Sequence, residues 1–256
     1  MGHPDYFYRI QTKPFMRLIL LSIMSAALLW SCAPKQQEQA AAEPAANVLT
    51  DDEKAAGWVL LFDGQTMNGW RSYKGSEQDC WEVLDGALHC KGAMDADKRA
   101  DILTAEQFEN YEFAFEWKIS PGGNSGVIYR CSEEFDAPYY SGPEYQVIDD
   151  AGYKGDLTEL QKAGANYDMH IAEGKVASPV GEWNQGKIVV NGTHCEHWLN
   201  GKKVVEYEFG SEDWTKRKAA SKWKDAAGYG MTTKGHIDLQ DHGHDVWYRN
   251  LKIKAL

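Results

Sequence analysis

The stretch NYEFAFEWKIS, residues 110–120, alternates apolar and polar side chains over its whole length. In an extended chain, successive side chains point to opposite faces, so the apolar residues of this stretch share one face. That face carries Tyr111, Phe113, Phe115, Trp117 and Ile119. The pattern predicts a long strand with one face in a hydrophobic core and the other in solvent.

Strand patterns continue on both sides of this stretch. They cover residues 57–62, 80–90, 126–130, 144–148, 186–190, 194–199, 199–209, 235–243 and 246–256. Asp85-Gly86 and Asn200-Gly201 are typical of two-residue hairpin turns. Only residues 211–226 show a helical pattern. Many short strands between turns predict an all-β fold, a two-sheet jelly-roll sandwich with a concave ligand face and one short helix.

The predicted domain contains four cysteines, Cys80, Cys90, Cys131 and Cys195. An even number in an exported domain is compatible with disulfides. In the hairpin predicted over residues 80–90, however, Cys80 faces Lys91 and the two thiols point to opposite faces. We therefore expect no bond between Cys80 and Cys90, while the other pairings remain open.

The N-terminal part of the chain predicts export. Residues 16–32, MRLILLSIMSAALLWSC, contain a basic residue, an apolar segment too short to span a membrane, and a cysteine. We interpret residues 1–31 as a signal peptide whose true start is Met16, and Cys32 as the lipidated first residue of an exported lipoprotein. Residues 32–50 are predicted to be the lipidated cysteine and a flexible tether, and residues 51–256 the jelly-roll domain. The alternative is an ordinary cleaved signal with an unmodified Cys32.

Charge limits the possible partners. Removal of the leader, with three basic residues and one acidic residue, changes the formal net charge from −11 to −13. Such a surface repels nucleic acid, so we exclude that class of partner. The ten Trp and thirteen Tyr residues fit both a sandwich core and a sugar-binding surface, and composition does not separate the two uses.

Seven motifs occur in a characteristic order. They are LFDGQTMNGW, GGNSGVIYR, GPEYQVIDD, GANYD, GEWNQGKIVVNG, HWLNGKKV and GHIDLQDHGHDVWYRNLKIKAL. Over residues 58–256 this ordered set resembles the 3-keto-disaccharide hydrolase family. The resemblance implies a concanavalin A-like jelly roll, often an exported lipoprotein facing the periplasm or the cell surface of the outer membrane. It also implies cleavage of glycosides that carry a ketone at carbon 3, without a cofactor.

Two other functions remain open. A lipid-anchored jelly roll could bind carbohydrate without catalysis. The spacing of Glu144, Gln146 and Asp149 also resembles the E-x-D-x-x-E strand of laminarinase-type retaining glycosidases, although Gln146 stands where the middle acid would be.

The candidate catalytic residues follow from the strand patterns and from the resemblance. Glu144 and Gln146 alternate with the apolar pair Tyr145 and Val147, so we expect them on the face opposite to the core. The catalytic residues are predicted to be Glu144, as acid or base, with Arg130 and His242 stabilising an oxygen anion. Alternation places Arg130 on one face with Gly126 and Ile128, although a surface salt bridge is its alternative role.

Seven further residues are predicted to bind substrate: Gln146, Asp149, Tyr167, Trp183, Asn184, His197 and Gln240. For His197, a position in the core or in a subsite wall is the alternative, because it shares a strand face with Cys195 and the apolar Leu199. For Tyr167, the alternative is a role in a turn.

Residues 240–245, QDHGHD, hold the densest group of potential metal ligands. A short loop rarely completes a coordination sphere alone, so we expect activity without a tightly bound ion. A calcium or zinc site is the alternative.

We predict that Cys32 carries a lipid, because a short signal ends at this residue and a low-complexity tether follows it. Intact-mass analysis of the mature protein should find Cys32 as an acylated N-terminus. An unmodified N-terminus at another residue would contradict the prediction.

Overall fold

The computed structural model describes residues 45–256. The predicted signal peptide, Cys32 and most of the predicted tether lie outside these residues. Among the described residues, no helix is both long enough and apolar enough to cross a bilayer.

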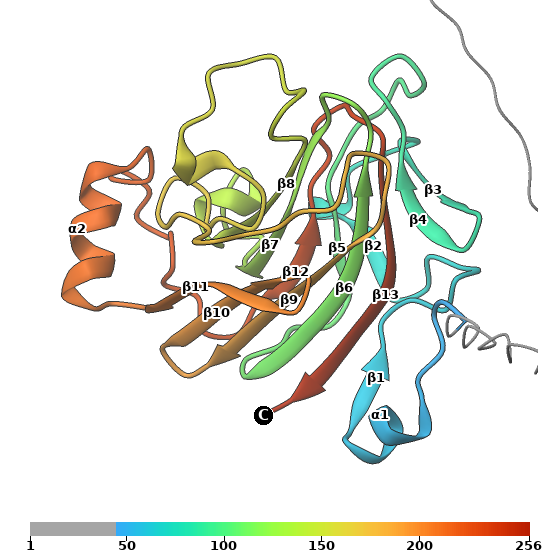
Figure 1. Ribbon diagram of the computed structural model, residues 1–256, viewed down its shortest axis with the longest axis horizontal. Coiled ribbons are helices and arrows are strands. Elements are labelled where there is room, and N and C mark those ends of the chain that lie inside the picture. The colour runs from blue at the N-terminus through green and yellow to red at the C-terminus, as the bar shows by residue number, and fades with distance from the viewer. Residues whose placement is uncertain (1–44) are drawn as a thin grey trace, which may run out of the picture. The chain divides into compact units, whose positions relative to one another are not determined.

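The described chain forms two antiparallel sheets packed face to face in a jelly-roll sandwich (Figure 1). The larger sheet has the strand order β11-β10-β9-β6-β13-β4-β3, with β1 paired to β13. Its strands are β1 (Trp58–Leu60), β3 (Trp81–Leu84), β4 (Ala87–Cys90), β6 (Tyr111–Ile119), β9 (Asn184–Asn191), β10 (His194–Leu199), β11 (Lys202–Glu208) and β13 (Val246–Ala255). The predicted all-β class is confirmed.

The smaller sheet has the strand order β2-β5-β12-β7-β8. Its strands are β2 (Trp70–Ser72), β5 (Ile102–Thr104), β7 (Asn124–Cys131), β8 (Glu144–Ile148) and β12 (His236–Leu239).

Helical segments are short. The α-helices are α1 (Asp51–Ala55) and α2 (Glu212–Ala220), and the 3₁₀ turns are η1 (Tyr73–Gly75), η2 (Pro138–Tyr140) and η3 (Glu159–Gln161). The Ser211 hydroxyl caps α2 by accepting from the Trp214 N–H at 3.1 Å. The predicted helix is thus confirmed, but it ends at Ala220, so Trp223 lies beyond it.

β6 has the predicted alternation. Its five apolar residues are buried between the sheets, while Glu112 and Glu116 lie on the outer face and pair with Lys254 and Arg249 of β13. The long apolar face of β6 therefore packs in the core of the sandwich.

The smaller sheet differs, because it is buried on both faces. Every residue of β5, β7, β8 and β12 is buried. One face packs against the larger sheet. On the other face, Leu103, Ile128 and Cys131 form a second apolar cluster with Tyr73, against which Tyr139 packs. In Figure 1 the long connections around β8, coloured green to yellow, and the segment around α2 lie on the same side of the sandwich as β7 and β8. A polar residue on this outer face is therefore shielded from bulk water.

The end of the predicted tether belongs to the folded domain. Asn47 is buried, and its backbone N–H donates to Asn250 Oδ1 at 2.5 Å. Its side-chain amide donates to Gly86 O at 2.8 Å, and its Oδ1 accepts from the Asn250 N–H at 2.9 Å. One asparagine thus links the segment before residue 50 to the β3–β4 turn and to β13.

The β3–β4 hairpin turns at Asp85-Gly86 as predicted, with both residues at positive φ. The predicted separation of the two cysteines is wrong, however. Cys80 lies in a bend just before β3, where strand alternation no longer applies, and its thiol approaches the same carboxylate as the thiol of Cys90. Both residues are free thiols in the structure.

We predict that Asn47→Ala lowers the free energy of unfolding by about 1–3 kcal/mol, because it removes two side-chain hydrogen bonds and leaves their partly buried partners unpaired. Urea unfolding should show the loss. Val48→Ala, at an exposed neighbouring residue, is the control and should behave as wild type. An unchanged midpoint for Asn47→Ala would show that the segment is not anchored.

Candidate active site

Acidic side chains meet on the outer face of the smaller sheet. In the strand register, Asp238 of β12 lies opposite Ile128 of β7, and Ile128 lies opposite Glu144 of β8. All three therefore share one row and one face, with Tyr145 and Val147 on the core side. The predicted separation of Glu144 from the core residues of its strand is confirmed.

Glu144 is placed by a glycine. A Cβ at Gly126 would lie 2.4 Å from Glu144 Oε1, so any larger residue at this position would collide with the carboxyl group. Glu144 is 5 % exposed, and burial raises its pKa from 4.5 to about 8. The Lys222 ammonium opposes this rise, whereas the Asp101 carboxylate adds to it. Glu144 therefore exchanges a proton near neutral pH.

Two more carboxyl groups lie close to Glu144. Burial raises the pKa of Asp101 to about 7, although Asp101 Oδ1 accepts the Asp241 N–H at 2.8 Å. Asp238 is completely buried, and neither of its carboxyl oxygens has a hydrogen-bond partner among residues 45–256. Burial raises the pKa of Asp238 well above its usual range, and the charges of Asp101 and Glu144 raise it further. The cluster is therefore rich in carboxyl groups that hold protons at neutral pH.

Lys222 supplies a positive charge beside this cluster. Its Nζ lies 3.9 Å from the centroid of the Tyr167 ring and 4.3 Å from that of Trp223. Loss of solvation lowers the pKa of Lys222, while the charges of Glu144 and Asp168 act in the opposite direction. Trp223 is held in place by its indole N–H, which donates to Tyr167 O at 3.1 Å. The result is a cation held on an aromatic wall.

Uncommitted amide groups complete the site. Gln146 donates to Gln161 O at 3.1 Å, but its own Oε1 has no partner in the described chain. Gln240 Oε1 is likewise without a partner there, and the Gln240 N–H donates to Gly126 O at 3.0 Å. Both buried oxygens therefore retain unused hydrogen-bond acceptor capacity.

His242 follows two residues after Gln240 and is exposed. Partial desolvation lowers the pKa of His242, and the charges of His244 and Lys222 add to the lowering. The structure thus brings together five of the predicted residues: Glu144, Gln146, Tyr167, Gln240 and His242.

Arg130 points elsewhere, so its predicted face is wrong. Between Ile128 and Cys131, β7 contains one residue more than the paired segment of β12, and Arg130 has a φ of 55°. This bulge breaks the alternation. The Arg130 guanidinium lies 4.3 Å from the centroid of the Phe209 ring and donates to Gly192 O at 2.5 Å.

Asp149 and Asn184 have structural partners. The Asp149 carboxylate accepts backbone N–H groups from Gly122 at 2.8 Å and Gly152 at 3.0 Å, and it therefore stabilises a turn. Asn184 Oδ1 accepts from the Ser178 N–H at 2.7 Å. Neither side chain lies in the cluster around Glu144.

His197 and Trp183 also lie outside the cluster. His197 is fully buried in the core, with Nε2 at 2.7 Å from the Tyr129 hydroxyl and Nδ1 at 3.0 Å from Gly164 O. Its alternative role as a core residue is the one that the structure supports. Trp183 stacks under Arg249, whose guanidinium lies 4.1 Å from the ring centroid, beside the larger sheet.

The potential ligands of residues 240–245 diverge. Asp241 forms a salt bridge with Arg99 at 2.6 Å, and Asp245 lies 2.8 Å from His89 Nε2. The rings of His242 and His244 stack with their centroids 5.8 Å apart.

Three residues of the cluster were not predicted from the sequence: Asp101, Asp238 and Lys222. Each acid stands beside or inside a short apolar strand, DILT or HIDL, where burial of a carboxyl group is costly. An acid in such a strand was therefore the sequence signal that could have identified Asp101 and Asp238 as functional residues. Lys222 was hidden by the helix predicted over residues 211–226, which ends before it.

Comparison with known proteins identifies a family. Residues 57–254 match the sequence profile of the 3-keto-alpha-glucoside-1,2-lyase-like domain. A 3-keto-disaccharide hydrolase of Bacteroides thetaiotaomicron is 34 % identical over 93 % of this chain and 97 % of its own.

Two crystal structures from Parabacteroides distasonis, both of proteins assigned to the glycosyl hydrolases, are also similar. The first is 40 % identical with a TM-score of 0.77 and covers 83 % of this chain and 100 % of its own. The second is 30 % identical with a TM-score of 0.61 and covers 78 % of this chain and 99 % of its own.

The raised pKa of Glu144 predicts a pH-dependent stability. The folded protein holds this proton more tightly than the unfolded chain, so the carboxyl group stabilises the fold below about pH 4.5 and loses that contribution as the pH rises through about 8. Wild type should therefore lose stability relative to Glu144→Gln across this window, by at most about 1.4 kcal/mol per pH unit. Urea unfolding at several pH values measures the difference.

The exposed residue Glu134 provides the control, since Glu134→Gln should follow wild type at every pH. Parallel stability curves for wild type and Glu144→Gln would show that Glu144 is ionised in the folded protein.

Proposed function

The chain belongs to the family of 3-keto-alpha-glucoside-1,2-lyase-like domains, and from this membership we propose that it is an enzyme that cleaves the glycosidic bond of 3-keto-glycosides. The observation that carries the proposal is the buried Glu144, which exchanges its proton near neutral pH beside a fixed cation. The similar hydrolase of B. thetaiotaomicron, named for 3-keto-disaccharides, supports this choice of substrate class.

The chemistry of a 3-keto sugar defines what the protein must supply. A ketone at carbon 3 acidifies the proton on carbon 2, because the resulting carbanion is delocalised as an enediolate. A base that removes this proton allows the leaving group on carbon 1 to depart by elimination, and water then adds to the double bond. The reaction needs a base near carbon 2, positive charge or donors at the oxygen on carbon 3, and an acid for the leaving oxygen.

Glu144 acts as the base in this proposal. A catalytic base is most effective when its pKa lies near the working pH, and burial raises the pKa of Glu144 to about 8. Gly126 leaves the space that the carboxyl group occupies, so its position is fixed before substrate binds. A preorganised base of this kind costs little reorganisation during the reaction.

Lys222 stabilises the oxygen anion. Its ammonium group lies on the ring of Tyr167, near enough to Glu144 to shift the pKa of that carboxyl group. As negative charge moves from Glu144 to the enediolate, Lys222 remains close to it. Lys222 thus takes the role predicted for Arg130, and His242 keeps its predicted role at the exposed edge of the site.

The buried carboxyl groups and amides supply the remaining functions. Burial raises the pKa of Asp238 well above its usual range and that of Asp101 to about 7, so Asp238, and Asp101 in its protonated form, can donate to the leaving oxygen. The unpartnered oxygens of Gln146 and Gln240 accept hydrogen bonds from sugar hydroxyls.

Direct displacement by a carboxylate pair is the second mechanism, and Glu144 with Asp238 provides two carboxyl groups on one face. A non-catalytic sugar-binding role is less well supported, because a binding module has no need of buried groups that exchange protons. The proposed location is that of an exported lipoprotein anchored through Cys32, with the domain facing the periplasm or the cell surface.

We predict that Glu144→Gln lowers turnover of a 3-keto-glucoside about 10²- to 10⁴-fold while leaving substrate binding largely intact, since it removes the titrating group and keeps its size. Single-turnover rates and equilibrium binding separate the two effects. The product formed in D₂O by wild type should carry deuterium at carbon 2.

The exposed Glu134→Gln is the matched control and should retain full activity. The unoxidised glucoside should react far more slowly than its 3-keto derivative. A wild-type rate for Glu144→Gln would end this assignment, and the absence of deuterium at carbon 2 would favour direct displacement.

A further inference from the structure

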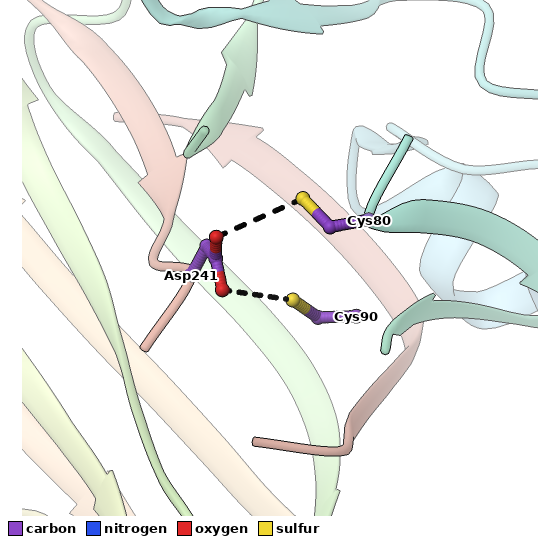
Figure 2. A group of neighbouring side chains, drawn as sticks. All are labelled: Cys80, Cys90 and Asp241. Atoms are coloured by element: carbon purple, nitrogen blue, oxygen red, sulfur yellow. Dashed lines mark hydrogen bonds between the residues drawn. The ribbon is translucent and has the colours of Figure 1, made fainter. Parts of the chain in front are cut away.

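Two thiols meet at one carboxylate behind the candidate active site. Figure 2 shows the sulfur atoms of Cys80 and Cys90 directed at the two oxygens of Asp241, at 3.7 Å and 3.4 Å. One carboxylate oxygen and the two sulfur atoms all lie within 4.8 Å of one another. Both cysteines are completely buried. Three polarisable or charged groups are therefore packed together at the start of β3 and the end of β4.

Arg99 already supplies the positive charge of this cluster. Its Nη2 donates to Asp241 Oδ1 at 2.6 Å, and its Nε donates to Oδ2 at 3.0 Å. The guanidinium also lies 3.7 Å from Cys90 Sγ. A divalent metal held by the two sulfurs and the carboxylate would sit beside this fixed cation, which opposes its binding. The geometry therefore favours chemistry between the two sulfurs over metal binding.

We propose that Cys80 and Cys90 form a redox site that closes into a disulfide. The oxidant is a disulfide compound, such as oxidised glutathione or a protein dithiol oxidase. The Cys80 thiolate attacks one sulfur of the oxidant to give a mixed disulfide and release one thiol. The Cys90 thiolate then attacks Cys80 Sγ and releases the second thiol. The pair loses two electrons and two protons, and the oxidant gains them.

The surroundings suit Cys80 to be the attacking thiol. The hydrogen bond from Cys90 lowers the pKa of Cys80, in opposition to burial, and the charge of Arg99 adds to the lowering. Cys80 also stands just before β3, the edge strand of the larger sheet, where local opening exposes the sulfur most easily.

The other two cysteines of the described chain are equally buried but lie in other surroundings. Cys131 lies in the apolar cluster with Leu103 and Ile128, and Cys195 donates to the Tyr129 hydroxyl at 3.4 Å. Burial raises the pKa of both thiols. They therefore serve as internal controls for the reactivity of the proposed pair.

The pair is connected to the candidate active site through Asp241. Its backbone N–H donates to the Asp101 carboxyl group at 2.8 Å, and its chain neighbours are Gln240 and His242. Oxidation removes two S–H donors from the Asp241 carboxylate and leaves Arg99 as its partner. The disulfide is thus expected to hold the β3–β4 hairpin in place beside the loop that carries these residues.

Differential alkylation of the full-length protein tests the proposal without reference to catalysis. The protein is equilibrated with oxidised glutathione, denatured, alkylated without reduction and mapped by mass spectrometry. We expect a crosslinked peptide pair containing Cys80 and Cys90 that is two hydrogens lighter than the thiol form, with Cys131 and Cys195 alkylated. Complete alkylation of Cys80 and Cys90 would overturn the proposal.

Thermal unfolding gives a second measurement. Closing this loop should raise the Tm of oxidised wild type by about 5–10 °C over the dithiothreitol-reduced form, whereas Cys90→Ser should show no dependence on the reductant. An equal Tm in both forms of wild type would also contradict the proposal. Stoichiometric zinc in the purified protein, with both thiols protected until chelation, would assign the cluster to a metal instead.

Discussion

The carboxyl group of Glu144 lies where a Cβ at Gly126 would stand, and the active-site proposal depends on this contact. The smaller sheet is buried on both faces, so a carboxyl group on its outer face is removed from bulk water. Burial in turn moves its pKa towards neutrality and makes the nearby cation effective over a longer range. The larger sheet has no such cover over β6, and its outer charges pair with one another across strands.

Most of what could be predicted from the sequence followed from the alternation of apolar and polar side chains along the strands. It identified β6 and its buried face, and it separated Glu144 and Gln146 from Tyr145 and Val147, because a strand within a regular ladder leaves each side chain only two directions. The hairpin at Asp85-Gly86 was predictable for a similar local reason, since its turn requires two residues at positive φ.

The rest depended on irregularities that alternation does not contain. One extra residue in β7 rotates Arg130 away from Glu144, and a bend before β3 brings Cys80 to the side of Cys90. α2 ends at Ala220, so Lys222 lies outside the helix and its ammonium group contacts the rings of Tyr167 and Trp223. Asp238 was not predicted, because the sequence does not show that β12 lies in the middle of its sheet, where an acid loses contact with water.

The charges of the site favour elimination over displacement on physical grounds. In the proposed site, burial makes each negative charge costly, and Lys222 is the cation that offsets the charge of Glu144. When Glu144 takes a proton from carbon 2, one negative charge moves from the carboxylate to the enediolate, and the total charge of the site is unchanged. Displacement by a carboxylate would instead build positive charge on the sugar ring and consume the anion that faces Lys222. A cation fixed beside the base therefore suits a reaction whose developing charge is negative.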